Sequence, residues 1–108
     1  MCSYNAMNGV PTCASSYLLQ DILRDHWGWT GEDQYVVSDC DAIQTIFSSH
    51  HFTDNPLQAV ADALNAGTDA NCGTYYPLHL PAAFDGELFN ISTLDQSLNR
   101  LYLSLIHI

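Results

Sequence analysis

The stretch "YVVSDCDAI", residues 35–43, joins an apolar run to an acidic end and decides the fold class. Its first three residues are typical of a short buried strand, and Ser38-Asp39-Cys40-Asp41 follows where that strand must end. A polar end of this kind is either a functional site or a capped turn. The rest of the chain has to decide between the two interpretations.

Strand-like and helix-like segments alternate on the N-terminal side of this stretch. Residues 1–4 are typical of the end of a strand. Ser15 or Ser16 can cap a helix that runs to about His26, because apolar residues recur on one face and Gly28 follows as a breaker.

The same alternation continues on the C-terminal side. A short helical turn is expected through Phe47, and Asn55 and Pro56 open a helix that Gly67 ends. Residues 68–72, "TDANC", indicate a short strand or loop, and Ser92 is predicted to cap a last helix. The side chains of that helix expected to point inward are Leu94, Leu98, Leu101, Tyr102 and Leu105.

Alternating strands and helices predict an α/β fold with a parallel sheet and helical crossovers. The 108 residues, 47% of them hydrophobic, suffice for one packed domain. Three parallel strands nevertheless leave two open edges and cannot close a barrel, which typically needs about 250 residues. The chain is therefore expected to be a piece of a larger domain.

The charge balance excludes two classes of partner. Two Lys and Arg residues against twelve Asp and Glu give a formal net charge of −10, which repels nucleic-acid phosphates and anionic lipids. No window approaches 18 uninterrupted apolar residues, and the N-terminus lacks the pattern of a signal peptide. No nucleic-acid or membrane partner is expected, and any targeting signal is expected to lie outside the chain.

Four cysteines, at positions 2, 13, 40 and 72, lack the C-x-x-C spacing of zinc or redox sites. The spacing leaves open whether the four cysteines form two disulfides or remain as four thiols. The Asn90-Ile91-Ser92 sequon is a candidate glycosylation site and, with the cysteines, favours a secreted protein. No cofactor or metal is expected, since adjacent residues such as His50-His51 point in different directions and indicate a solvated loop.

The three strand ends are all polar, and in a parallel sheet they meet at the ligand-binding edge. From spacing alone, Asp39 or Asp41 is more often a cap of the following helical turn than a catalytic group. Trp27 and Trp29 are interpreted as packing at a helix end. Tyr75-Tyr76 is interpreted as half-buried surface rather than as a platform for sugar stacking.

Three segments together resemble a known family. They are "MCSYNAMNGVPTCASSYLLQDILRDHWGWTG", "VVSDCDAI" and "ADALNAGTDANCGTYY", and they are similar to the end of the catalytic barrel domain of glycoside hydrolase family 3, in its β-xylosidase branch. The resemblance runs from Met1 to about Tyr102. It implies that residues 1–108 form part of that domain, as a fragment of a (β/α)8 TIM-like barrel containing about its last three βα units. Residues 103–108 depart from the pattern and are interpreted as an atypical tail, a candidate truncation artefact.

The resemblance also implies roles for individual residues. Asp39 matches the nucleophile that forms a covalent glycosyl-enzyme, Tyr4 matches a tyrosine beside it, and Met1 matches a residue of the same sugar subsite. Cys40 stands where the glucosidase branch commonly has tryptophan, and in the xylosidase branch it would be joined to Cys72.

A second disulfide has its own candidates in this chain. Cys2 and Cys13 could pair across the Asn8-Gly9 turn. The Cys40–Cys72 pair would stiffen the pocket wall beside Asp39.

The chemistry of these residue types agrees with the resemblance. A carboxylate nucleophile has to stay ionised, and a neighbouring tyrosine hydroxyl can hydrogen-bond to it. Retention of configuration requires a second carboxyl about 5–5.5 Å away. In the family that acid/base comes from a later, C-terminal α/β sandwich domain, and the lysine-histidine and arginine sugar contacts precede the segment matched by Met1.

The resulting hypothesis is a fragment of a secreted, retaining exo-β-xylosidase. The full-length enzyme would hydrolyse β-1,4-xylosidic bonds and release D-xylose from the non-reducing ends of xylo-oligosaccharides, or cleave aryl and alkyl β-xylosides. The fragment alone is expected to be inactive. The alternatives are a non-catalytic carbohydrate-binding remnant, and a β-glucosidase or α-L-arabinofuranosidase of the same family. An aspartyl phosphotransferase that uses Asp39 and Asp41 ranks last, because the chain has no lysine.

Overall fold

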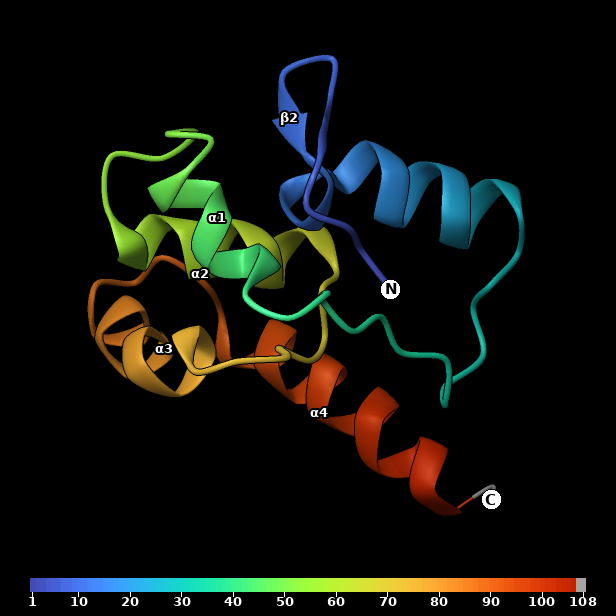
Figure 1. Cartoon of the computed structure of the whole chain (residues 1–108). Coiled ribbons are helices and arrows are strands. Elements are labelled where there is room, and N and C mark those ends of the chain that lie inside the picture. Colours follow the sequence, from blue (N-terminus) through green and yellow to red (C-terminus); the bar gives the residue numbers. More distant parts are fainter. Residues whose placement is uncertain (107–108) are drawn as a thin grey trace.

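The computed structural model describes residues 1–106, in which three short extended segments are surrounded by helices (Figure 1). The elements, in chain order, are β1 (Ala6–Met7), β2 (Val10–Pro11), η1 (Thr12–Ala14), η2 (Tyr17–His26), α1 (Ala42–Ser48), α2 (Pro56–Ala66), α3 (Tyr75–Asp85) and α4 (Ile91–Ile106). The architecture is α-rich α/β.

The three extended segments, which lie around Cys2, around Val37 and Ser38, and around Ala70, are separate from β1 and β2 and pair in parallel, as the sequence predicts. The Cys2 backbone N–H donates to the Val37 carbonyl at 3.0 Å, and the Asp39 N–H donates back to the Cys2 carbonyl at 2.8 Å. On the other side, the Ser38 N–H donates to the Ala70 carbonyl at 2.9 Å. The segment around residues 36–39 therefore lies between the other two, but each pairing amounts to a single isolated bridge, shorter than the strands expected.

A small antiparallel hairpin follows the first extended segment. β1 and β2 pair around Asn8 and Gly9, which have positive φ angles of 52° and 82°. Both angles lie in the left-handed region that such tight turns require and that Asn and Gly adopt most readily. A disulfide between Cys2 and Cys13, with 5.2 Å between the Cα atoms, closes the base of the hairpin, so this predicted candidate pair is formed.

The next segment is helical over the predicted range. η2 is a π-helix of ten residues, and the hydroxyl of Ser15 accepts a hydrogen bond from the Leu18 N–H at 3.2 Å. Ser15 therefore caps this helix, whereas the side chain of Ser16 makes no cap bond.

The two tryptophans that follow this helix behave differently from the prediction. Trp27 is 70% exposed, so its expected packing at the helix end was wrong. Trp29 is half-buried, packs against the core and lies 5.7 Å from the guanidinium of Arg24. Gly28, at φ +70°, turns the chain between the two tryptophans.

α2 begins and ends at the predicted residues. The Asn55 side chain accepts a hydrogen bond from the Gln58 N–H at 2.9 Å, and Pro56 occupies the first helical position. Gly67 closes the helix at φ +112°. A left-handed residue at this position is the usual way to end a helix, and glycine adopts it without strain.

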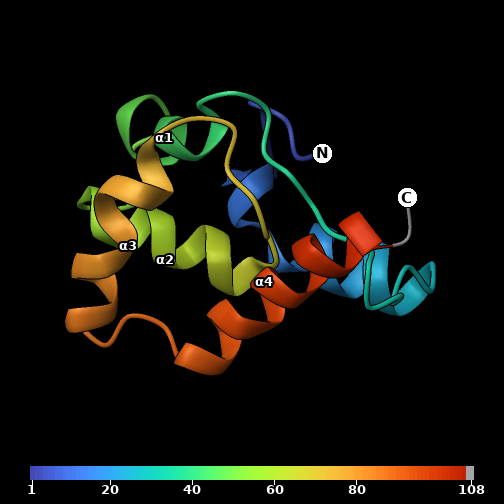
Figure 2. The same cartoon turned by 90° about the horizontal axis from the view of Figure 1, so that it is seen from below.

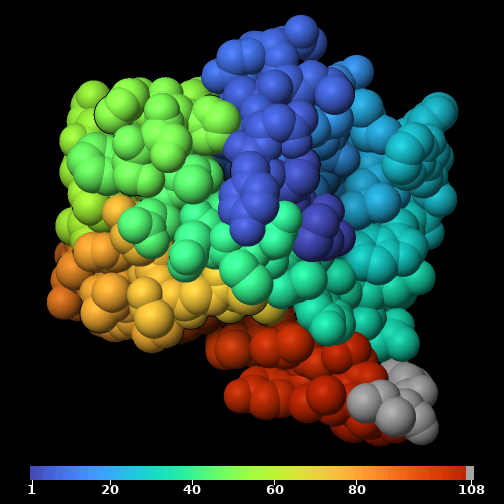
Figure 3. Space-filling view, viewed as in Figure 1, coloured from blue at the N-terminus to red at the C-terminus, as the bar shows by residue number. Residues whose placement is uncertain are grey.

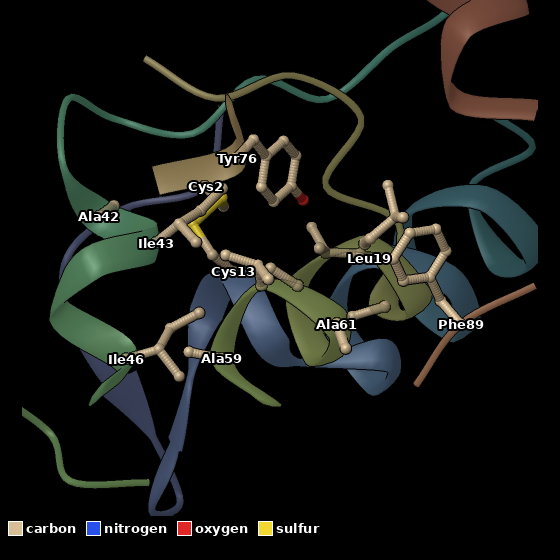
Figure 4. Packing of buried hydrophobic residues seen from close by; sticks show 14 of the residues in the cluster. Cys2, Cys13, Leu19, Ala42, Ile43, Ile46, Ala59, Ala61, Tyr76 and Phe89 are labelled. Carbon is tan, nitrogen blue, oxygen red and sulfur yellow. A yellow bond between two sulfur atoms is a disulfide. The ribbon is translucent and has the colours of Figure 1, made fainter. Parts of the chain in front are cut away.

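The hydrophobic core forms where α1, α2 and the disulfide of the hairpin meet (Figure 4). Four fully buried aliphatic side chains of α1 and α2 lie at its centre: Ile43, Ile46, Val60 and Leu64. Alanines of α2 are buried between them, which allows η1 and α1 to approach the helix closely. α2 is thus the central helix of the structure, with α3 packed against its other side (Figure 2).

α3 was not predicted from the sequence. It contains two prolines, Pro77 in its first turn and Pro81 inside, and proline inside a helix removes a hydrogen bond. Packing compensates, since Tyr76 is buried and its hydroxyl donates to the Thr68 carbonyl at 2.6 Å. Burial, together with the nearby charge of Asp69, raises the pKa of the Tyr76 phenol well above its ordinary value. The half-buried interpretation therefore holds for Tyr75 and was wrong for Tyr76.

α4 differs from the prediction in its start and in its buried face. It begins at Ile91, so Ser92 lies inside the helix rather than at its cap. Leu94 and Leu101 are partly buried as expected. Three other residues predicted to point inward are exposed: Leu98 (38%), Tyr102 (61%) and Leu105 (59%).

The position of α4 explains this difference. The helix extends away from α1, α2 and α3 along one side of the molecule (Figures 1 and 2), so only a narrow face contacts the rest of the chain. Ser97 and Arg100 lie on that face. Between residues 1 and 106, no helix combines the length and the apolar character that crossing a membrane requires.

A buried carboxylate joins α4 to the sheet. Asp69 Oδ2 accepts from the Arg24 guanidinium and from the Val36 N–H, each at 2.9 Å. Its Oδ1 accepts from the Ser97 hydroxyl at 2.7 Å and from the Arg100 guanidinium at 2.9 Å. The side chain of Asp69 has no exposed surface. Its partners include both arginines of the chain, which has no lysine.

We predict that Asp69→Ala lowers the free energy of unfolding of this chain by about 3–5 kcal/mol, because it leaves a buried guanidinium without its counter-charge. Asp95→Ala, an exposed substitution on α4, is the control and should change stability by less than about 0.5 kcal/mol. Denaturant unfolding of both variants measures the difference. A loss of less than about 1 kcal/mol for Asp69→Ala would show that the network is not a main source of stability.

Candidate functional site

The C-terminal ends of the three extended segments meet at one edge of the structure. The parallel bridges Cys2–Ser38 and Val37–Ala70 set their register. Residues 3–4, 39–41 and 71–72 follow these bridges and therefore lie at the same edge. In Figure 3 the blue N-terminal segment lies directly against the green segment that follows residue 39.

Asp39 is the last residue of the middle segment and is half-buried. Its Oδ1 accepts a hydrogen bond from the Cys40 N–H at 2.8 Å, which fixes one carboxylate oxygen close to the turn. Val36 and Ser38 point into the core, so by strand alternation Val37 and Asp39 point to the opposite face, away from the helices. The carboxylate is thus held by the backbone and directed away from the hydrophobic core.

Tyr4 lies beside this carboxylate. Its hydroxyl donates to the Cys40 carbonyl at 2.6 Å, and the Asp39 carboxylate acts on the same phenol. Partial desolvation raises the pKa of the Tyr4 phenol, and the negative charges of Asp39 and Asp41 raise it further. Tyr4 therefore keeps its proton and remains a hydrogen-bond donor beside Asp39.

The turn after Asp39 is tied to the third segment. A disulfide joins Cys40 to Cys72, with 4.4 Å between the Cα atoms, and the Asp41 N–H donates to the Cys72 carbonyl at 2.8 Å. A side chain at Gly73 would bring its Cβ within 2.6 Å of Asp41 Oδ1, at a φ of +138° that favours glycine. The pairing implied by the family resemblance is therefore present in the structure.

Asp41 does not cap α1 with its side chain, so that interpretation was wrong. It stands at the cap position, but its φ of +64° is left-handed, and the carboxylate makes no cap hydrogen bond. The physical reason is the tether to Cys72, which requires Asp41 to direct its own N–H toward that loop.

Met1 is placed by register rather than by contacts. It lies level with Val37, since Cys2 pairs with Ser38, and it is 74% exposed. Because Cys2 points into the core, Met1 points to the same face as Asp39. Its role in a sugar subsite remains a prediction.

Two residues at this edge were not assigned a role from the sequence. Ser38 is buried and its hydroxyl accepts from the Cys72 N–H at 3.1 Å, which holds the loop after the third segment. His50 was predicted to lie in a solvated loop, but its Nε2 lies 2.6 Å from the Tyr4 carbonyl oxygen. Neither contact has a sequence signal, because each partner lies more than thirty positions away.

The edge is open rather than enclosed. A cleft of about 640 Å³ lies elsewhere, between η2, the loop of residues 30–32 and α4, and its lining contains neither Asp39 nor Tyr4. Within residues 1–106, no cluster of three or more His, Cys, Asp or Glu side chains is arranged to hold a metal ion. Asn90, the candidate glycosylation site, is exposed just before α4.

Comparisons with known proteins show which family the chain resembles. Residues 1–102 match the family described as the glycosyl hydrolase family 3 N terminal domain. The chain is 56% identical over 106 residues to a probable exo-1,4-beta-xylosidase, bxlB, of Aspergillus fumigatus. That match covers 98% of this chain and 14% of the relative. This chain is also 50% identical over 108 residues to the exo-1,4-beta-xylosidase bxlB of Emericella nidulans. That match covers 100% of this chain and 14% of the relative.

A solved structure is similar as well. It is a GH3 exo-beta-xylosidase, XlnD, in complex with a xylobiose aziridine activity based probe, and it superposes with a TM-score of 0.94 at 43% identity. The match covers 98% of this chain and 14% of that one. The chain thus spans about one seventh of the length of the proteins it resembles.

We predict that Asp39→Asn lowers the pKa of Tyr4 toward its ordinary value, because a negative charge beside a phenol disfavours the phenolate. Ultraviolet absorbance titration, taken as the difference between each protein and its Tyr4→Phe counterpart, isolates this one tyrosine. Asp25→Asn is the control, because the charge of Asp25 is not among those that act on Tyr4. An unchanged Tyr4 pKa in Asp39→Asn would contradict the contact between the two side chains.

Proposed function

Because this chain belongs to glycosyl hydrolase family 3, as part of its N-terminal domain, we propose that it forms the nucleophile-bearing segment of an exo-β-xylosidase. The full-length enzyme would remove D-xylose from the non-reducing ends of xylo-oligosaccharides. The observation that carries the proposal is the Asp39 carboxylate, which lies at the end of a parallel strand segment beside the Tyr4 hydroxyl.

The proposed reaction is a double displacement with retention of configuration. Asp39 attacks the anomeric carbon, the glycosidic C–O bond breaks, and the leaving oxygen takes a proton from an acid supplied outside this chain. Water then attacks the same carbon, the ester bond to Asp39 breaks, and the water proton passes to the same group, now acting as a base. Tyr4 would stabilise the carboxylate when the ester releases it, because its phenol remains protonated.

The same arrangement supports assignment to a barrel. Parallel segments joined by helices, with their polar ends at one edge, are the repeating unit of a (β/α)8 barrel. We assign the chain to about the last three βα units of such a barrel. A C-terminal α/β sandwich domain elsewhere in the full-length protein would supply the acid/base.

The proposed sugar is a pentose. Cys40, which is joined to Cys72, stands where the glucosidase branch of the family commonly has a tryptophan, and the sequence resembles the xylosidase branch instead. Identities of 50–56% to proteins named exo-1,4-beta-xylosidases favour xylose over arabinose or glucose. Two disulfides and the exposed sequon at Asn90 are consistent with secretion.

A chimera tests the proposal, because the chain spans only 14% of its relatives. This segment replaces its counterpart in the Emericella nidulans bxlB, and turnover of an aryl β-xyloside is measured. We predict that Asp39→Asn lowers kcat by at least about 10⁴-fold, in the range seen when a catalytic nucleophile is removed.

The matched control is Asp41→Asn in the same chimera. Asp41 is an exposed carboxylate two residues away, and its loss should change kcat by less than about tenfold. Near-normal turnover by Asp39→Asn, or equal losses in both variants, would exclude Asp39 as the nucleophile. An unmutated chimera that binds xylo-oligosaccharides without cleaving them would favour a carbohydrate-binding role instead.

A further inference from the structure

The loop that follows α1 returns to the first extended segment. His50 is half-buried, and its Nε2 lies 2.6 Å from the carbonyl oxygen of Tyr4. His51, the next residue, is exposed and has a φ of +52°. The two adjacent histidines are therefore in different environments, and only His50 is directed at the candidate site.

The partner of His50 determines its protonation at that atom. A backbone carbonyl oxygen can only accept a hydrogen bond, so Nε2 must carry a proton and donate it. The contact is then a directional bond between an imidazole N–H and the main chain of Tyr4. Such a bond fixes the position of the Tyr4 backbone rather than that of its ring.

The end of α1 fixes His50 in turn. The His50 N–H donates to the Thr45 carbonyl at 2.9 Å, and the Phe52 N–H donates to the Ile46 carbonyl at 3.0 Å. Ile46 is fully buried in the core. His50 is therefore attached to a rigid helix that begins immediately after the Asp39 turn.

Tyr4 is held at two points. Its carbonyl accepts from His50, and its hydroxyl donates to the Cys40 carbonyl at 2.6 Å. Both partners belong to one continuous stretch, residues 39–50, which contains Asp39 and α1. Holding the backbone and the phenol together fixes the distance between the Tyr4 hydroxyl and the Asp39 carboxylate.

We infer that His50 is a positioning residue for the reaction, which acts through Tyr4 by fixing the backbone that carries the phenol. The inference rests on the proposed function, because it assigns His50 to the site of Asp39. His50 itself does not contact the reacting atoms in this role.

The test uses the same chimera, with kcat and KM measured on an aryl β-xyloside. His50→Leu should lower kcat about tenfold, because the backbone that carries the Tyr4 phenol loses one hydrogen bond that fixes it, with a smaller change in KM. His50→Gln should recover most of the rate, because its amide N–H can donate to the same carbonyl. His51→Leu is the matched control and should leave kcat within about twofold of the unmutated chimera.

A double-mutant cycle separates positioning from general stability. In a Tyr4→Phe background the phenol no longer has a hydroxyl to position, so His50→Leu should cost about twofold or less. Three results would each overturn the inference: an unchanged kcat in His50→Leu, equal losses in His50→Leu and His50→Gln, or the same loss with and without the Tyr4 hydroxyl. If His50→Leu does not fold, His50→Ala, which also removes the donor, is measured in both backgrounds instead, with the same expected losses and the same contradicting results.

Failure of this inference is distinguishable from failure of the proposed function. The unmutated chimera and Asp39→Asn report on the function, whereas the His50 variants are compared only with an active unmutated chimera. An active chimera that needs Asp39 but is indifferent to His50 keeps the function and removes the positioning role.

Discussion

The carboxylate of Asp69 is the interaction on which the rest of the structure depends. It accepts one bond from the backbone of Val36 and one from each of Arg24, Ser97 and Arg100, so it joins η2, the middle extended segment and α4. A charge without exposed surface is stable only when such partners compensate its lost hydration. In a chain with a net charge of −10, both arginines are used for this one carboxylate.

The same residue sets the register that builds the candidate site. The Asp69 and Ala70 N–H groups both donate to the Val36 carbonyl, at 2.8 and 3.1 Å, while the Asp69 side chain accepts from the Val36 N–H. This exchange aligns the second and third segments at their starts. Three residues further on, Asp39 and Cys72 consequently arrive at one edge, where the disulfide joins the two loops. The position of Asp39 is thus a consequence of a charge network at the other end of the strands.

The sequence predicted a helix correctly where the residues that begin and end it form their contacts locally. Asn55, Pro56 and Gly67 fix α2 by a cap, a preset φ and a left-handed closure, and none of these needs a distant partner. α3 was missed because Pro77 and Pro81 argue against a helix that only packing on α2 stabilises. The spacing of apolar residues in α4 predicts one apolar face, but it does not predict which part of the chain packs against the helix. The polar pair Ser97 and Arg100, facing Asp69, defines the buried side instead.

Asp39 and Asp69 illustrate what a sequence can and cannot give about a site. Both follow short apolar or small residues near a strand, and the resemblance to a family, not the local pattern, singled out Asp39. In the structure each oxygen of Asp69 accepts from two donors, which occupies all four of its lone-pair directions. A carboxylate in that state is a poor nucleophile, because its lone pairs are engaged in hydrogen bonds and no substrate can reach a side chain without exposed surface. Asp39, half-buried, with one backbone donor on Oδ1 and a protonated phenol beside it, is oriented and keeps a lone pair for attack. Long-range hydrogen bonds therefore separate the structural aspartate from the proposed nucleophile, and those bonds are the part of the site that a linear pattern does not contain.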